Sequence, residues 1–162
     1  MTVERPYAVD AAAALPQYSD MVYKIALSQT KKKYDAEDVF QEVFLRLVKH
    51  SGKINSEEHL KAWLIRVTLN CCKKHFRIWN AGPDILNDAA SCMMPEEHDV
   101  YYAVLELPRK YRTVIHLFYY EELSVREIGA VLKVKETTVK SQLFRARGIL
   151  RERLKEGFGD DE

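Results

Sequence analysis

Residues 123 to 154 read LSVREIGAVLKVKETTVKSQLFRARGILRERL, a pattern typical of two helices joined by a tight turn. Ser124 and Glu127 stand at the spacing of a capping box, in which each side chain accepts an amide hydrogen at the start of the first helix. Apolar residues recur at helical spacing in the second helix and predict its buried stripe: Val139, Leu143, Ala146, Leu150 and Leu154. This arrangement indicates a helix-turn-helix, whose second helix enters the DNA major groove.

The second helix is far more basic than the rest of the chain. Between Lys133 and Lys155 there are eight Lys or Arg and two Glu, a net charge of +6, whereas the whole chain carries +1. A solvated amphipathic helix could also be basic. Phe144, however, lies on the predicted outward face and needs a surface to cover, such as a thymine methyl group or a sugar edge. That face carries Lys140, Ser141, Phe144, Arg145 and Arg147.

Length and composition limit the possible classes of protein. A chain of 162 residues with 47% hydrophobic and 30% charged residues forms one or two small globular domains. No apolar run approaches the roughly 18 residues of a membrane helix, so we expect no membrane insertion, and Glu4 and Arg5 before a short apolar stretch argue against a secretory signal. Three cysteines, an odd number, indicate no disulfide framework and a reducing, cytoplasmic location.

The periodicity is helical nearly throughout, so the sequence predicts an all-α fold of two small helical domains joined by a flexible linker. The first domain covers residues 1–77. The linker covers residues 78–98, where Gly82, Pro83 and Pro95 interrupt the helical pattern. The helix-turn-helix domain covers residues 99–155, with a short helix from Asp99, and an acidic tail covers residues 156–162. In the next helix, which begins at Leu107 and Pro108, Tyr111, Val114, Ile115 and Phe118 are predicted to point inward.

The first domain begins with two predicted helices. One runs from Leu15 to Ser28 with Leu15 on its buried side, and the other runs from Ala36 to Lys49 with Asp35 as its N-cap. The second helix has a predicted core stripe of Phe40, Val43, Phe44, Leu47 and Val48. Its opposite face carries Asp38, Gln41, Glu42 and Leu45. A solvated acidic face explains this pattern, and Leu45 in its middle also fits a surface that contacts a partner.

A third helix, from Ser56 and Glu57, becomes strongly basic. Between Lys61 and Arg77 there are five Lys or Arg and no acidic residue. The predicted buried stripe comprises Leu60, Leu64, Val67 and Cys71, and the opposite face carries Trp63, Arg66, Asn70, Lys73, Lys74 and Arg77. Aromatic rings beside a basic strip suit single-stranded nucleic acid, because rings stack on unpaired bases while cations follow the backbone. Trp63 and Phe76 could equally be core aromatics.

The sequence carries no pattern of an enzyme. It has no glycine-rich phosphate loop, no set of His, Cys and acidic residues at metal-ligand spacing, and no nucleophile motif around a Ser or Cys. We therefore expect no catalytic activity, no metal and no cofactor.

Four blocks of sequence carry a resemblance to a known family. They are YDAEDVFQEVFLRL at 34–47, AWLIRV at 62–67 followed by Asn70, LPRKYR at 107–112, and TTVKSQLFRAR at 137–147. In this order and spacing the chain resembles, from about residue 15 to 154, the extracytoplasmic-function group of bacterial RNA polymerase sigma factors. The family usually has glycine in the helix-turn-helix turn, where this chain has Lys133. A left-handed Lys133 would cost on the order of 1 kcal/mol, or the turn would take another shape.

The resemblance implies a transcription initiation factor that binds core RNA polymerase and directs promoter recognition and DNA opening. Asp38, Gln41, Glu42 and Leu45 would dock on the clamp helices of the largest polymerase subunit. Trp63, Arg66, Asn70, Lys73, Lys74 and Arg77, with the loop at 50–56, would hold the opened minus-ten strand. Thr138, Lys140, Ser141, Phe144, Arg145 and Arg147 would bind the minus-thirty-five duplex. An anti-sigma factor is a further expected partner, and it could hold the chain at the membrane.

Two other functions are compatible with parts of the sequence. A helix-turn-helix regulator that acts independently of polymerase would need an effector or phosphorylation module, whereas residues 1–77 carry an acidic helix and an aromatic-basic one. A helical adaptor without a DNA role would leave both basic strips unexplained.

Overall fold

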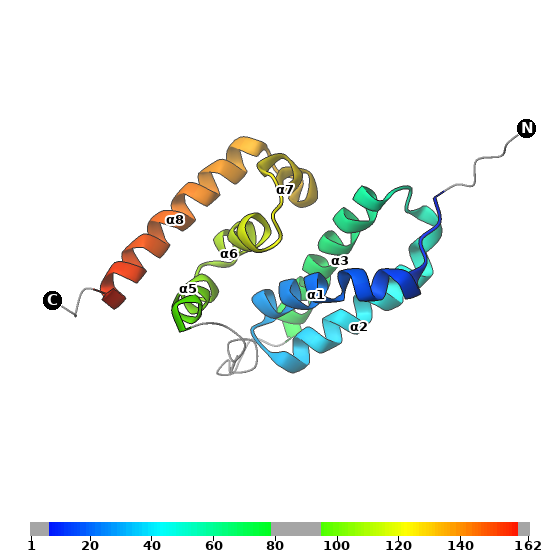
Figure 1. Ribbon diagram of the computed structural model, residues 1–162, viewed down its shortest axis with the longest axis horizontal. Helices are drawn as coiled ribbons and strands as arrows, with labels where there is room; N and C mark the ends of the chain where they lie inside the picture. The colour runs from blue at the N-terminus through cyan, green and yellow to red at the C-terminus, as the bar shows by residue number, and fades with distance from the viewer. Residues whose placement is uncertain (1–6, 79–94, 159–162) are drawn as a thin grey trace, which may run out of the picture. The chain divides into compact units, whose positions relative to one another are not determined.

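The computed structural model describes residues 7–78 and 95–158, and every regular element in these two ranges is helical. The chain forms two compact units, Met1–Pro83 and Asp84–Glu162 (Figure 1). The predicted all-α fold is thus confirmed. None of the helices in the described ranges is both long and apolar enough to span a bilayer.

Unit 1 is a bundle of three helices, α1 (Ala11–Thr30), α2 (Lys33–His50) and α3 (Glu57–Ile78), with a short 3₁₀ turn η1 (Ser51–Lys53) between the last two. Each helix contacts the other two, so the apolar faces meet along a common axis (Figure 1, blue to green). The largest fully buried side chains of this core include Val22, Ile25, Leu47, Ile54, Leu64 and Ile65.

Helix α1 begins four residues before the predicted start. Asp10 caps it, because its carboxylate accepts a hydrogen bond from the Ala12 amide at 3.0 Å. The predicted burial of Leu15 is wrong, since this side chain is 42% exposed. The predicted N-cap of α2 is also wrong: Lys32 occupies that position without a side-chain cap, and Asp35 lies inside the first turn. There its negative charge interacts favourably with the positive, N-terminal end of the helix dipole.

The buried faces of α2 and α3 are shifted from the predicted stripes. In α2, Val43, Phe44 and Leu47 are buried as predicted, but Val48 is 62% exposed and Phe40 is only partly buried. In α3, Val67 is likewise half-buried. Each helix packs against two neighbours rather than one, so the buried arc is wider than a single stripe and is centred elsewhere. The residues that join the core in this way are Ala36, Val39, Ile65, Thr68, Leu69 and Cys72.

Two polar features lie within the helix contacts of unit 1. The Tyr18 hydroxyl on α1 donates a hydrogen bond to Glu57 Oε2 on α3 at 2.7 Å. Burial, the hydrogen bond and the glutamate charge together raise the pKa of Tyr18 to about 12. On α3, Cys71 and Cys72 are buried and carry thiols rather than a disulfide, and burial followed by the Glu42 charge raises the pKa of Cys71.

Unit 2 contains α5 (Pro95–Leu105), α6 (Arg109–Ile115), a π-helical turn η2 (His116–Tyr120), α7 (Val125–Leu132) and α8 (Glu136–Phe158). Helix α5 begins before the predicted Asp99, and α3 extends into the predicted linker at Ile78. The rest of that linker lies outside the described residues, apart from the first residues of α5. The core of unit 2 includes Leu107, Ile115, Leu117, Ile128, Val139 and Leu143.

Helix α6 packs under α8 and is tied to α5 by a buried arginine. Arg112 is only 3% exposed, and its Nη1 donates to the Leu105 carbonyl at 3.0 Å and to the Leu107 carbonyl at 3.4 Å. The first bond satisfies a carbonyl at the end of α5, and the second satisfies a carbonyl in the connection to α6. Of the residues predicted to point inward, Val114 and Ile115 are buried, whereas Tyr111 and Phe118 are only half-buried. Pro108 is the N-cap of α6, just before its first turn.

Candidate nucleic-acid and polymerase interfaces

The helix-turn-helix in unit 2 is built by α7 and α8. The predicted capping box is present: the Glu127 amide donates to Ser124 Oγ at 3.1 Å, and the Ser124 amide donates to Glu127 Oε1 at 3.2 Å. At the other end of α7, Lys133 adopts the left-handed conformation with φ 57° and ψ 44°. The turn therefore keeps the shape that a glycine would favour, with the steric cost that a lysine side chain brings.

Gly129 allows this turn to close, and sequence reasoning missed it. Its carbonyl accepts hydrogen bonds from the amides of Lys133 and Val134, the latter at 3.0 Å. A Cβ at Gly129 would lie 2.9 Å from the Val134 carbonyl oxygen, closer than real Cβ contacts come. The signal in the sequence was a glycine in the middle of a short amphipathic helix, a position that usually costs stability unless a close approach requires it.

The outward face of α8 carries the residues predicted to bind duplex DNA. Lys140, Ser141, Phe144, Arg145 and Arg147 are all exposed, and Thr138 is half-buried. Phe144 is 77% exposed, so a large apolar ring stands in water among polar and basic groups. The opposite face supplies Val139, Leu143 and Ala146 to the core. The two faces of α8 are therefore separated as the spacing predicted.

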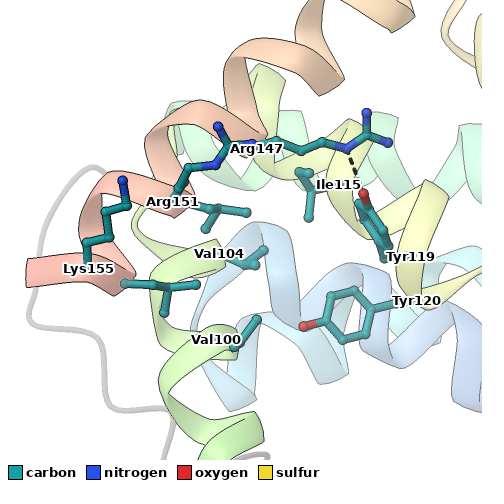
Figure 2. A pocket seen from close by; sticks show the side chains of 10 residues that line it. Val100, Val104, Ile115, Tyr119, Tyr120, Arg147, Arg151 and Lys155 are labelled. Carbon is teal, nitrogen blue, oxygen red and sulfur yellow. Dashed lines mark hydrogen bonds between the residues drawn. The ribbon is translucent and has the colours of Figure 1, made fainter. Parts of the chain in front are cut away.

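Arg147 is held by a tyrosine from the α6–η2 segment. Arg147 Nε donates to the Tyr119 hydroxyl at 2.6 Å, and its guanidinium lies 5.5 Å from the centroids of the Phe118 and Tyr119 rings. Figure 2 shows the Arg147 side chain reaching across to Tyr119. Arg145 is the main cause of a lowered pKa of Tyr111.

A groove of about 610 Å³ lies beside Arg147, between α5, the α6–η2 segment and α8 (Figure 2). Its walls are apolar, and three cations of α8 lie along one edge. Leu150 and Leu154, predicted to be buried, are half-buried because they line it. The complete lining consists of Val100, Val104, Ile115, Tyr119, Tyr120, Arg147, Leu150, Arg151, Leu154 and Lys155. Sequence reasoning missed this groove, since it joins helices far apart in the chain.

In unit 1, the acidic strip on α2 is only partly free. Asp38, Gln41 and Leu45 are exposed. Glu42 is half-buried and pairs with Arg46 at 2.7 Å and with Lys74 of α3 at 4.0 Å. The exposed Val48 lies one turn beyond Leu45 and adds a second apolar side chain to this strip. The sequence assigned Val48 to the core, so this extension of the strip was missed.

The basic face of α3 lies next to that strip. Asn70, Lys73 and Lys74 are exposed, whereas Trp63 and Arg66 are half-buried. Trp63 is not a core ring: it lies at the bundle edge, with its ring centroid 6.3 Å from that of His50 at the end of α2. The side chains of Phe76 and Arg77 lie outside the described residues, so the part of this strip assigned to Arg77 stays a prediction. Among the described residues, no cluster of His, Cys, Asp and Glu could hold a metal ion.

Comparisons with known proteins assign both units. Residues 16–78 match the family model Sigma-70 region 2, and residues 97–150 match Sigma-70, region 4. The chain is 30% identical to the ECF RNA polymerase sigma factor SigW of Bacillus subtilis, with 86% of each chain covered. It is 32% identical to SigM of the same organism, with 89% of this chain and 94% of the relative covered. The chain belongs to the ECF sigma factors.

Solved structures share the fold of this sigma factor. The sigma factor RpoE from Bartonella quintana, solved in complex with the anti-sigma factor NepR, superposes with a TM-score of 0.76 at 22% identity, covering 93% of this chain and 98% of that one. CnrH, solved in complex with the cytosolic domain of CnrY, superposes with a TM-score of 0.71 at 23% identity, covering 90% of this chain and 88% of that one. These structures show the shared fold. The two family models and the Bacillus subtilis relatives confirm the resemblance in the sequence, and this sigma factor is a transcription initiation factor. Nothing in the comparisons favours a regulator that acts without polymerase.

Proposed function

We propose that this sigma factor uses three separate surfaces for three steps of initiation. The α2 strip of Asp38, Gln41, Glu42 and Leu45 binds core polymerase. The α3 face of Trp63, Arg66, Asn70, Lys73, Lys74 and Arg77 holds the opened minus-ten strand. The α8 face of Thr138, Lys140, Ser141, Phe144, Arg145 and Arg147 binds the minus-thirty-five duplex.

The observation that carries the proposal is the exposure of Phe144 on a basic helix face. An apolar ring that is 77% exposed has a hydration cost that contact with a base methyl or sugar would relieve. Lys140 and Arg145 beside it are exposed and positive, as contacts with phosphate require. The strip on α2 supports the proposal in a different way, because exposed Leu45 and Val48 among polar residues suit a protein partner rather than a nucleic acid.

Three further parts of the proposal concern the setting of this activity. The nucleotidyl chemistry belongs to the polymerase, and this chain supplies sequence choice and strand opening, so it is not itself an enzyme. It acts in the cytoplasm, where the polymerase is and where the two buried thiols of α3 stay reduced. An anti-sigma factor is its further partner, since RpoE from Bartonella quintana, which has the same fold, forms a complex with the anti-sigma factor NepR.

Reconstitution with sigma-free core polymerase tests the proposal. The chain is added to core enzyme on fragmented genomic DNA of the source organism, and run-off transcripts are sequenced, with an established sigma factor as positive control. Transcripts that start at a shared upstream motif are expected. If the positive control initiates and this chain starts no transcript, the proposal fails.

Two variants separate the surfaces. Asp38→Arg places a positive charge on the α2 strip and is expected to weaken core binding at least tenfold, measured by fluorescence anisotropy of the labelled chain. Phe144→Ala is expected to leave core binding unchanged but to weaken binding of the holoenzyme to its selected duplex about 5- to 150-fold, the equivalent of 1–3 kcal/mol. Each variant is the matched control of the other. Normal core affinity of Asp38→Arg would contradict the docking assignment, and equal loss of both activities in Phe144→Ala would indicate misfolding.

A further inference from the structure

Arg145 and Arg147 lie on opposite edges of the outward face of α8. Two residues along an α-helix correspond to a rotation of about 200°, so their side chains leave the helix in nearly opposite directions. Lys140, Ser141 and Phe144 occupy the arc between them and away from the core, to which Val139 and Leu143 contribute from the other side. The two arginines therefore border the surface proposed to read bases.

Arg147 is fixed by a phenol group from outside α8. Arg147 donates to the Tyr119 hydroxyl at 2.6 Å, and its guanidinium lies 5.5 Å from the centroid of the Tyr119 ring, so one tyrosine restricts this side chain in two ways (Figure 2). Tyr119 belongs to the π-helical turn that follows α6, and α6 packs against α8.

Such contacts matter because a free arginine is flexible. A solvated arginine side chain samples many rotamers and loses that freedom when it binds phosphate, whereas a tyrosine has only two side-chain torsions. A phenol oxygen takes up one of the five N–H groups of a guanidinium, so the remaining donors stay free for a second acceptor. An arginine already bound to a tyrosine thus loses less conformational entropy when it binds DNA.

We propose that Tyr119 is a positioning residue that holds Arg147 ready for a phosphate beside the bases read by α8. The inference rests on the proposed function, because it requires that α8 bind duplex DNA. It assigns a part in DNA binding to a tyrosine that does not lie on the recognition helix.

The test uses holoenzyme formed with the full chain and a duplex that the wild-type holoenzyme has selected from a random-sequence pool. Tyr119→Phe removes only the hydroxyl and keeps the ring packing. It is expected to weaken duplex binding about three- to tenfold. Because the arginine charges remain, the slope of log affinity against log salt concentration should stay as in the wild type. Arg147→Ala, in contrast, should lower both the affinity and the slope, the latter by about one.

A double-mutant cycle separates positioning from a direct role. In the Arg147→Ala background, Tyr119→Phe should have no further effect, because the group that it positions is gone. Tyr102→Phe makes the same change on α5 of the same unit and should bind as the wild type does. Melting temperatures equal to that of the wild type would show that the hydroxyl deletions leave unit 2 folded.

Three outcomes would overturn the inference: Tyr119→Phe binds normally, Tyr119→Phe weakens binding equally with and without Arg147, or Tyr119→Phe strengthens binding. The proposed function fails separately. If Phe144→Ala, Arg145→Ala and Arg147→Ala all bind the selected duplex as the wild type does, α8 is not the duplex-binding helix.

Discussion

Lys133 occupies a backbone position that most side chains avoid. Its φ of 57° places it in the left-handed region, where a residue with a Cβ costs about 1–2 kcal/mol relative to its usual conformation. Two hydrogen bonds offset this cost, because the Lys133 and Val134 amides both donate to the Gly129 carbonyl. These bonds end α7 and direct the chain into α8. The helix-turn-helix geometry is therefore retained without the glycine that usually stands there.

Lys133→Gly should accordingly stabilise the protein. The expected gain in the free energy of unfolding is about 0.5–1 kcal/mol, since glycine avoids the strain but also increases the entropy of the unfolded chain. Urea unfolding followed by circular dichroism measures it. Lys133→Ala is the control, because it removes the lysine side chain and keeps the Cβ. An equal gain in both variants would attribute the effect to charge rather than to the backbone.

At the scale of helices, the sequence predicted the elements better than their faces. The capping box and the outward face of α8 followed from spacing alone, because caps and helix faces are local properties. The burial of Leu15 and Val48 was predicted wrongly, since only the packing of three helices decides which apolar residues are covered. The tyrosine partner of Arg147 could not be predicted either, because Tyr119 lies 28 residues from Arg147 along the chain.

The contact between α1 and α3 makes unit 1 sensitive to alkaline pH. Tyr18 must stay protonated to donate to Glu57, and its pKa rises from 10.0 unfolded to about 12 folded. A raised folded pKa means that this contribution is fully present below pH 10 and is lost as the pH rises through 12. Tyr18→Phe should therefore be less stable than the wild type by about 1–2 kcal/mol at pH 9. The difference should shrink between pH 10 and pH 12.

Urea unfolding of both proteins at pH 9, 10, 11 and 12 measures this difference. Tyr34→Phe is the control, because Tyr34 on α2 is 80% exposed and removal of its hydroxyl should change the free energy of unfolding little. A constant gap between Tyr18→Phe and the wild type over the whole pH series would contradict the assignment of the alkaline loss to Tyr18.

At the scale of the molecule, each unit has its own core and its own proposed partner surfaces. The α2 and α3 surfaces belong to the three-helix bundle of unit 1, and the α8 surface belongs to unit 2. Folding and binding can therefore be changed in one unit at a time. This division was visible in the sequence as a change from long helical stripes to Gly and Pro near residues 82, 83 and 95.

Gly129→Ala is expected to destabilise unit 2 alone. The added Cβ would meet the Val134 carbonyl oxygen at 2.9 Å, and such overpacking costs about 1–3 kcal/mol. Hydrogen exchange should show faster exchange in α7 and α8 and unchanged exchange in α1 to α3. Gly148→Ala is the matched control, because its Cβ meets no atom within 4 Å. Alanine in a helix interior should raise the free energy of unfolding by up to about 1 kcal/mol. If Gly129→Ala accelerates hydrogen exchange equally in both units, the two units unfold together.

The buried thiols of α3 have a practical consequence for kinetics. Cys71 and Cys72 are at most 1% exposed, so a thiol reagent such as an aromatic disulfide reaches them only when the bundle opens. Once Cys92 is replaced by serine, the colour released by that reagent reports the rate of opening without an attached dye. Repeating the measurement with core polymerase present would show whether the proposed docking at α2 slows or speeds the opening of the bundle that we propose to hold the opened strand.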